Sequence, residues 1–365
     1  MLNTNRFYQR LCANGVELFC GVPDSLLKDF CACITENTSH KKNIIAANEG
    51  NALAIASGHY LATGKPALVY MQNSGLGNIV NPLLSLNDVD VYNIPALLII
   101  GWRGEPEIHD EPQHIKQGKL TLPLLDTMSI KYAILENENQ IDNAFTYMKE
   151  TNKPFAFIVK KGTFESYKKS ESISKYNLTR EDAIKTVISL LKSNDIVVST
   201  TGMISRELYE NRNSHEKDFL TVGSMGHASS IAFGIALAKS DRTVFCFDGD
   251  GAFLMHLGAT PVIASRNLNN FKHIIFNNEA HDSVGAQPTI SNNINLSDVA
   301  KSLGYKKTFQ VTSIDEIKNA WNEFSSATEP SLLEIKVKCG SRKDLGRPKE
   351  KPIENKNAFM NFLKG

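Results

Sequence analysis

Two predicted strands of this sequence end in side chains that could bind a hard cation. The apolar run Val244–Phe247 has the length of a buried parallel strand and is followed by Asp248-Gly249-Asp250-Gly251. The run His273–Phe276 ends at Asn277-Asn278, and Ala252–Ser265 between the two runs reads as a helix. Carboxylate and amide oxygens are ligands that Mg²⁺ prefers, usually together with phosphate oxygens. Asp250 alone is more typical of a helix cap, but the Asn-Asn pair ending the next strand favours a metal site.

The glycines beside Asp250 extend this prediction to an anion. Gly249 and Gly251 would let the backbone approach a ligand closely. The N–H groups that begin the following helix would face that ligand, and open α/β sheets bind ligands at the carboxyl ends of their strands. The stretch therefore predicts a phosphate-bearing ligand held by a divalent cation.

The order GDG, helix, strand, NN resembles the Mg²⁺–diphosphate motif of thiamine-diphosphate enzymes. The resemblance implies that Asp250 and Asn278 bind Mg²⁺ through their side chains, and Ala280 through its backbone carbonyl. It also implies that Gly249 and Gly251 lie against the diphosphate of the cofactor.

A second segment, Ala46–Ala54, resembles the part of this family that carries the catalytic glutamate. Glu49 stands there at a predicted strand-to-helix junction. In the family this carboxylate hydrogen-bonds the aminopyrimidine ring and so promotes removal of the thiazolium C2 proton. The alternative interpretation is an acidic residue that only stabilises a helix N-terminus.

A third segment, Gly223-Ser224-Met225-Gly226, resembles the one that shapes the cofactor in this family. The resemblance implies that Met225 holds the cofactor bent and that the Gly223 carbonyl accepts a hydrogen bond from its 4′-amino group. Taken by itself, Met225 is equally an ordinary core residue. Thr201 and Gly202, which follow another predicted strand, are assigned to the diphosphate.

Strands and helices alternate along both halves of the chain, which predicts an α/β protein with two doubly wound parallel sheets. We expect an aminopyrimidine-binding domain at residues 1–165 and a diphosphate- and Mg-binding domain at residues 179–365. The polar, serine-rich residues 166–178 are the predicted linker, and Thr179 with Asp182 forms a capping box after it. No middle domain of the kind common in the family is expected.

Several stretches resemble the phosphonopyruvate-decarboxylating branch of the family: GVPDSLL, ANEGNALAIASGHYLATGK, GWRGEPEIHDEPQH, STTGMISREL, VGSMGHASS and NNEAHDSVGAQPT. The implied reaction is the thiamine-diphosphate- and Mg²⁺-dependent decarboxylation of 3-phosphonopyruvate to phosphonoacetaldehyde and CO₂, in phosphonate biosynthesis. Decarboxylation of sulfopyruvate is the alternative. A carboligase or an inactive cofactor-binding scaffold fits less well.

A substrate with a carboxylate and a phosphonate requires a pocket rich in cations and hydrogen-bond donors. The candidate substrate-binding residues are Arg103, His109, His114, His281 and Gln287, which Gln113 and His227 could assist. His281 and His114 are also candidate proton carriers, because an unperturbed imidazole titrates near neutrality. Asp24 is either a further catalytic acid or the cap of a helix predicted at Leu26–Thr35.

The composition is that of an ordinary globular protein of 365 residues, with a net charge of +1 and 42% hydrophobic residues. It offers no basic excess for nucleic acid and no apolar stretch long enough for a bilayer. The N-terminus has no apolar signal core, so we expect a cytoplasmic protein. The six scattered cysteines are expected to be reduced, buried thiols. The family resemblance implies a homodimer or higher homo-oligomer with the cofactor at the subunit interface.

Overall fold

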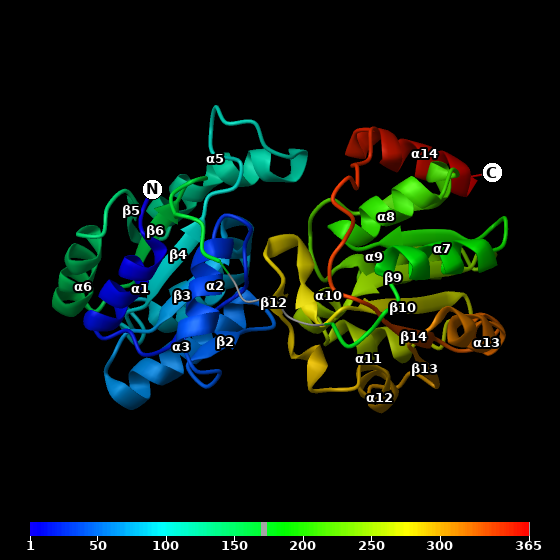
Figure 1. Ribbon diagram of the computed structural model, residues 1–365, viewed down its shortest axis with the longest axis horizontal. Coiled ribbons are helices and arrows are strands. Elements are labelled where there is room, and N and C mark those ends of the chain that lie inside the picture. Colours follow the sequence, from blue (N-terminus) through cyan, green and yellow to red (C-terminus); the bar gives the residue numbers. More distant parts are fainter. Residues whose placement is uncertain (169–173, 365) are drawn as a thin grey trace. The chain divides into compact units, whose positions relative to one another are not determined.

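The computed structural model describes residues 1–168 and 174–364, and the chain divides into two compact units, Met1–Glu171 and Ser172–Gly365. Each unit has its own parallel sheet of six strands with helices packed on both faces (Figure 1). The predicted fold class is therefore confirmed. Residues 169–173 of the predicted linker lie outside the described residues. Within the described part, no helix is both long and apolar enough to cross a membrane.

The first unit has the strand order β2-β1-β3-β4-β6-β5. Its strands are β1 (Phe19–Gly21), β2 (Asn43–Ile45), β3 (Leu68–Gln72), β4 (Leu97–Gly101), β5 (Lys131–Ile134) and β6 (Phe155–Val159). Its helices are α1 (Thr4–Ala13), α2 (Lys28–Asn37), α3 (Glu49–Thr63), α4 (Leu76–Pro82), α5 (Pro112–Thr127) and α6 (Gln140–Thr151), with short turns η1 (Asn73–Gly75) and η2 (Leu83–Asn87). The chain reverses its direction across the sheet between β1 and β3, and ligands of such sheets bind at this switch point.

The second unit has the strand order β13-β14-β10-β9-β7-β8, with the switch point between β7 and β9. Its parallel strands are β7 (Ile196–Ser199), β8 (Asp218–Leu220), β9 (Val244–Gly249), β10 (Phe271–Asn277), β13 (Lys307–Val311) and β14 (Ser331–Lys336). A small antiparallel hairpin joins β11 (Ala280–His281) to β12 (Gln287–Pro288). The helices are α7 (Arg180–Leu190), α8 (Met203–Asn211), α9 (Ala228–Ala238), α10 (Asp250–Met255), α11 (Ala259–Ala264), α12 (Leu296–Ser302), α13 (Ile314–Ser325) and α14 (Pro352–Lys364), with turns η3 (His215–Lys217), η4 (Asp282–Val284) and η5 (Ile290–Asn292).

Local sequence signals account for several helix ends. The Asn48 side chain accepts a hydrogen bond from the backbone N–H of Asn51 and so caps α3. Gly64 ends the same helix in the left-handed conformation, with φ of 69°. Thr179 caps α7 by accepting from the N–H of Asp182, which confirms the predicted N-cap, and the Asp182 carboxylate accepts from the Thr179 hydroxyl.

One helix prediction was wrong. The single helix expected at Ala252–Ser265 is two short helices, α10 and α11, because His256 leaves helical geometry and Gly258 follows it. Gly226 lies against this break, since a Cβ atom placed on it would stand 2.6 Å from Cδ2 of His256. The lysine-rich residues near the C-terminus form α14, which buries Phe359.

Each unit packs an apolar core on both faces of its sheet. Phe30 and Phe157 lie in one cluster of the first unit, and Leu98 in the other. In the second unit Phe247 and Ile275 belong to the two corresponding clusters. Each large side chain that is fully buried contributes about 1.5–3 kcal/mol. These cores fix the strand ends that carry the polar residues described below.

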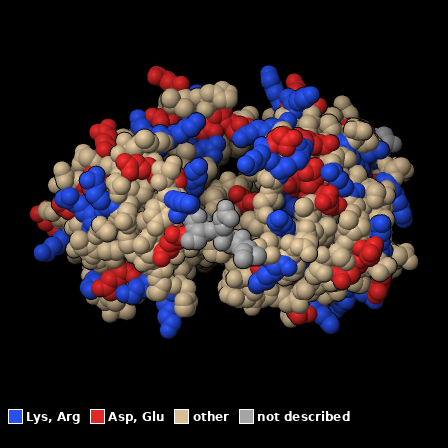
Figure 2. Space-filling view, viewed as in Figure 1, with Lys and Arg blue, Asp and Glu red and all other residues tan. Residues whose placement is uncertain are grey.

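Charged side chains of both signs are interspersed over the face shown in Figure 2, which fits the near-neutral net charge of +1. All six cysteines are free thiols, as predicted. Four are buried and Cys339 is half-buried, but Cys12 is exposed, so the expectation of burial was wrong for Cys12.

Candidate active site

Glu49 is held at the switch point of the first unit. It is the first residue of α3 and is buried, and its Oε2 accepts a hydrogen bond of 2.6 Å from Nδ2 of Asn78. Gly75 in turn η1 lies against the same carboxylate, because a Cβ atom on Gly75 would stand 2.4 Å from Glu49 Oε1. A residue that only stabilised a helix N-terminus would not need this enclosure. The structure thus presents Glu49 in one fixed orientation.

Arg103 is bound tightly to Asp110 in the loop that follows β4. Its guanidinium donates from Nε at 2.8 Å and from Nη2 to the two carboxylate oxygens of Asp110, and Nη1 donates to Ser25 Oγ at 2.8 Å. Burial would raise the pKa of Asp110, but hydrogen bonds from Arg103 and from backbone N–H groups hold it below its usual range. The Arg103 guanidinium is therefore held in one orientation by an ionised partner.

Asp24 lies beside this pair and is not the cap of α2. The residue before α2 is Leu27, which makes no side-chain capping bond. The fully buried Asp24 carboxylate instead accepts from the N–H of Leu26 at 2.9 Å and from Nε2 of Gln72 at 2.6 Å. Burial raises its pKa, against the hydrogen bond from Gln72. A carboxyl group with a raised pKa is suited to proton transfer.

The two histidines of the same loop are placed differently. His114 is buried on α5, and its carbonyl packs so closely on Gly104 that a Cβ atom there would stand 1.9 Å from it. His109 is exposed. Turn η1 links this loop to Glu49, because Nδ2 of Asn73 donates to the Arg103 carbonyl at 2.8 Å. Of the predicted residues in the first unit, Glu49, Asp24 and Arg103 therefore gather around the η1 turn.

Asp250 is the centre of the polar residues in the second unit. It begins α10 at the end of β9 and is buried, with an exposure of 2%. The hydroxyl of Thr289 donates to its Oδ2, and Ser291 Oγ lies 2.7 Å from the same oxygen. Sequence reasoning missed Thr289 and Ser291, because they lie on turns far along the chain without a recognisable pattern.

These residues fit a divalent cation. Burial raises the pKa of Asp250 to about 6, and the partners that oppose this shift are hydroxyl and backbone N–H groups, not cationic side chains. Asn278 is also buried and directly follows β10. Because Phe276 of β10 is paired with Gly249 of β9, the two predicted ligands lie at the ends of adjacent strands. Oδ1 of Asn278 accepts one bond, from the N–H of Ala280 at 3.2 Å, and an amide oxygen has a second lone pair. A bound cation would compensate the buried carboxylate.

His281 and Met225 flank the glycine that follows Asp250. A Cβ atom on Gly251 would stand 2.8 Å from Cε1 of His281 and 3.4 Å from Cε of Met225. His281 is paired with Gln287 across the β11–β12 hairpin. Burial lowers the pKa of His281 to about 4, so its imidazole is neutral near pH 7.

The remaining predicted residues of this unit lie on neighbouring loops. Thr201 Oγ1 donates to the Val222 carbonyl at 2.9 Å and so joins the loop after β7 to the loop that carries Gly223. Gly202 has a φ of 94° and lies near Ser283, and Gly249 lies near Ile204. The structure thus places all of these predicted residues at one edge of the second sheet.

A buried ionic triad fixes the segment after His281. Arg180 donates from Nε and Nη2 to both oxygens of Glu207, at 2.7 and 2.9 Å, and from Nη1 to Asp282 Oδ2 at 2.9 Å. Asp282 is the next residue after His281. No sequence pattern joins these three residues, since they come from α7, α8 and η4, and they were not predicted.

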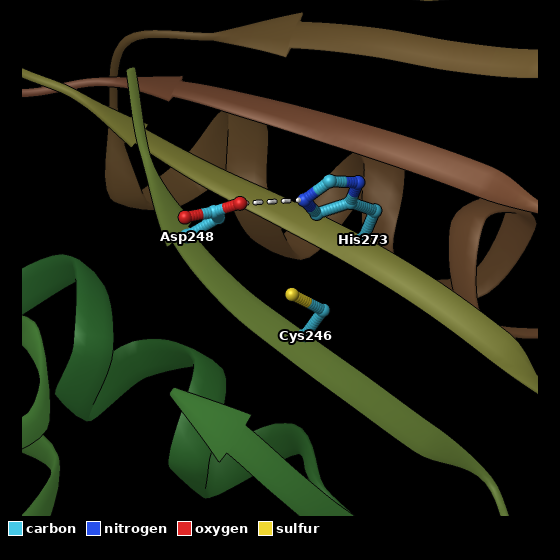
Figure 3. A group of neighbouring side chains, drawn as sticks. All are labelled: Cys246, Asp248 and His273. Carbon is cyan, nitrogen blue, oxygen red and sulfur yellow. Dashed lines mark hydrogen bonds and ion pairs between the residues drawn. The ribbon is translucent and has the colours of Figure 1, made fainter. Parts of the chain in front are cut away.

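A second buried cluster lies within the same sheet, beneath the GDG turn. Cys246 and Asp248 of β9 and His273 of β10 point toward one another (Figure 3), and Nε2 of His273 lies 3.4 Å from Oδ2 of Asp248. Nδ1 of His273 lies 3.3 Å from the Tyr305 hydroxyl. All four residues are buried, so they act as an internal support of the turn and not as part of the open strand edge.

Comparison with known proteins decides the family. The thiamine pyrophosphate enzyme N-terminal TPP binding domain matches residues 3–130, and the C-terminal TPP binding domain of such enzymes matches residues 198–335. A phosphonopyruvate decarboxylase of Streptomyces viridochromogenes is 32% identical over 96% of this chain and 92% of its own length. The chain belongs to the family of thiamine pyrophosphate-dependent decarboxylases.

Two further relatives of this decarboxylase family match most of the chain. A phosphonopyruvate decarboxylase of Streptomyces hygroscopicus is 31% identical over 99% of this chain and 94% of its own length. A sulfopyruvate decarboxylase of Methanosarcina acetivorans is 31% identical over 90% of this chain and 89% of its own length. Thiamine diphosphate is therefore the cofactor for which the two sheets provide binding domains.

The close packing of Gly75 against the Glu49 carboxylate allows a specific prediction about turnover. Gly75→Ala places a methyl group where Glu49 Oε1 now lies, so the carboxylate must move. We expect turnover to fall by ~10²-fold, because a displacement of about 1 Å in a catalytic group has effects of this size. Gly77→Ala is the matched control, since nothing lies within 4 Å of a Cβ atom there. Steady-state turnover of both variants, with circular dichroism as a folding check, tests this. Wild-type turnover in folded Gly75→Ala would contradict it.

Proposed function

We propose that this enzyme decarboxylates 3-phosphonopyruvate to phosphonoacetaldehyde and CO₂, with thiamine diphosphate and Mg²⁺ as cofactors, in phosphonate biosynthesis. The observation that carries the proposal is the near-complete match to two phosphonopyruvate decarboxylases, at 96% and 99% of the chain. Support also comes from the polar groups gathered at both switch points. When bound, thiamine diphosphate supplies the electron sink that accepts the electron pair left by departing CO₂.

The second unit is proposed to hold the diphosphate end of the cofactor. Asp250 and Asn278 bind Mg²⁺ through side-chain oxygens, and Ala280 binds it through its carbonyl. Gly249, Gly251, Thr201 and Gly202 line the diphosphate. Met225 holds the cofactor in its bent conformation, and the Gly223 carbonyl accepts a hydrogen bond from the amino group of the cofactor. The pKa of the buried Asp250 carboxyl group is raised to about 6, and none of the residues that shift this pKa is cationic. The missing positive charge supports the assignment of Asp250 as a metal ligand.

The first unit is proposed to activate the cofactor and to bind the substrate. Glu49 donates a proton to the aminopyrimidine ring and accepts it back, in the single orientation that Gly75 and Asn78 leave open. Arg103 binds the anionic groups of the substrate, helped by His109, His114 and Gln287. The reaction replaces the departing carboxylate with one proton at the same carbon. His281 is the proposed carrier of that proton, with Asp24 or His114 as a second group.

We also propose that the chain is at least a dimer and that each cofactor is held by the first unit of one subunit and the second unit of another. Neither unit by itself contains both Glu49 and Asp250. A dimer with two equivalent sites is the simplest symmetric arrangement that satisfies this requirement.

The alternative substrate is sulfopyruvate. It is supported by the 31% identity of this chain to the sulfopyruvate decarboxylase of Methanosarcina acetivorans. The decisive experiment measures release of CO₂ and aldehyde from both keto acids in parallel, with thiamine diphosphate and Mg²⁺ present. We expect a higher kcat/KM for 3-phosphonopyruvate. A higher value for sulfopyruvate would replace the proposed substrate, and no release from either would overturn the proposed reaction.

A further inference from the structure

A pair of opposite charges is buried in the second sheet behind the proposed metal site. Glu334 is fully buried on β14, and Lys336, two residues further along the strand, is also buried. The Lys336 Nζ atom lies 3.1 Å from Glu334 Oε1. Burying two ions is costly, and well-packed apolar residues would often serve stability as well. Neither residue has a part in the reaction proposed above, so the pair calls for a different role.

Glu334 determines how Asn277 is oriented. Its Oε1 accepts a hydrogen bond of 2.7 Å from Nδ2 of Asn277, and its Oε2 accepts one of 3.0 Å from the N–H of Ser297. An ionised carboxylate can only accept, so the amide NH₂ of Asn277 must face it. The Asn277 Oδ1 atom consequently faces the turn that follows β10.

The Asn277 oxygen then organises the turn that presents the metal ligands. It accepts a hydrogen bond of 3.0 Å from the N–H of Glu279, and Ser291 Oγ lies 2.9 Å from it. The same Ser291 hydroxyl oxygen lies 2.7 Å from Oδ2 of Asp250. A continuous series of hydrogen-bonding contacts thus runs from Glu334 through Asn277 and Ser291 to Asp250.

Lys336 also contacts the same turn, through Glu279. Glu279, between Asn278 and Ala280, has a φ of 61°, a left-handed conformation that is unfavourable for a residue with a side chain. Its Oε1 lies 3.8 Å from Nζ of Lys336, and its carbonyl accepts from the N–H of Thr289 at 3.0 Å. These contacts compensate the strain of the turn, as is usual where a strained residue serves a site.

We propose that Glu334 and Lys336 are positioning residues, which set the conformation of residues 277–280 and thereby the affinity of the metal site. The inference rests on the proposed assignment of Asp250, Asn278 and Ala280 as ligands. Residues that orient metal ligands from behind typically change metal affinity by about 10–100-fold when they are replaced. The pair should therefore act on the metal without touching it.

The test measures binding of Mn²⁺, as a probe for Mg²⁺, to the full chain in the presence of thiamine diphosphate, by electron paramagnetic resonance. Glu334→Gln can donate a hydrogen bond toward Asn277, which favours the flipped amide and loosens the turn. We expect Mn²⁺ affinity to fall by ~10–100-fold and the spectrum of the bound ion to change. Lys272→Met is the matched control, because Lys272 is also buried on this sheet but donates to the Ala327 carbonyl, away from the turn.

The double variant Glu334→Gln/Lys336→Met guards against misfolding, because it leaves neither charge buried without a partner. We expect it to fold and still to bind Mn²⁺ ~10–100-fold more weakly than the wild type. Wild-type affinity in the double variant would overturn the inference, as would an equal loss in Lys272→Met. Asp250→Ala tests the underlying assignment separately. If Asp250→Ala also bound Mn²⁺ normally, the proposed metal site itself would be wrong.

Discussion

Replacement of Glu49 by glutamine should leave thiamine diphosphate bound but slow the exchange of its C2 proton by ~10²–10⁴-fold. Glutamine keeps the shape of the side chain and can still accept the hydrogen bond from Asn78. The space beside Gly75 admits only one orientation, so the variant cannot compensate by moving. It can no longer stabilise a protonated ring nitrogen, which is the role proposed for Glu49.

The measurement is hydrogen–deuterium exchange at C2 of the bound cofactor, quenched with acid and quantified by nuclear magnetic resonance. Calorimetric titration of the cofactor shows in parallel that binding persists. Glu17→Gln serves as the control, because Glu17 is a half-buried residue whose carboxylate is paired with Lys65, away from the proposed site. Exchange at the wild-type rate in Glu49→Gln would refute the assigned role.

Mixing two inactive variants should restore activity if the cofactor lies between subunits. Glu49→Gln lacks the activating carboxylate and Asp250→Ala lacks the metal ligand, so each is expected to be inactive alone. In a hybrid dimer, one active site carries both substitutions and the second active site carries neither. With random exchange of equal amounts, half of the dimers are hybrids, and activity should reach about a quarter of the wild-type value.

Subunit exchange is followed independently by native mass spectrometry of one isotopically labelled variant. A mixture of equal amounts of wild-type protein and Glu49→Gln should keep about half of the wild-type activity whether or not subunits exchange, so it controls for effects of mixing alone. If hybrids form and no activity returns, each chain completes its own site and the proposed arrangement is incorrect. Activity near a quarter of the wild-type value would support the shared site.

The sequence predicted those parts of the structure that depend on short, local patterns. The strand that ends at Gly249 and the strand that ends at Asn277 are apolar runs with abrupt polar ends, so both were recognised. The capping residue Thr179 was also recognised, because the cap and its partner are three residues apart. Interactions of this kind are set by neighbours in the chain.

Features that depend on distant residues could not be predicted. Thr289 and Ser291 reach Asp250 from positions 39 and 41 residues away, through turns that have no periodicity. Nothing in the sequence around Glu334 indicated that its carboxylate would face Asn277, 57 positions away. The break between α10 and α11 was missed because it depends on packing of Gly226 against His256.

The separate cores of the two units have a consequence for how the protein unfolds. The clusters around Phe30 and Leu98 draw on the first unit alone, and those around Phe247 and Ile275 on the second. Cooperative unfolding requires that the loss of one contact weakens the others, and a core supplies this coupling only within itself. Each unit should therefore unfold cooperatively within itself, around its own core. A ligand bound by both units would couple their unfolding, so adding it should draw the midpoints of the two units together.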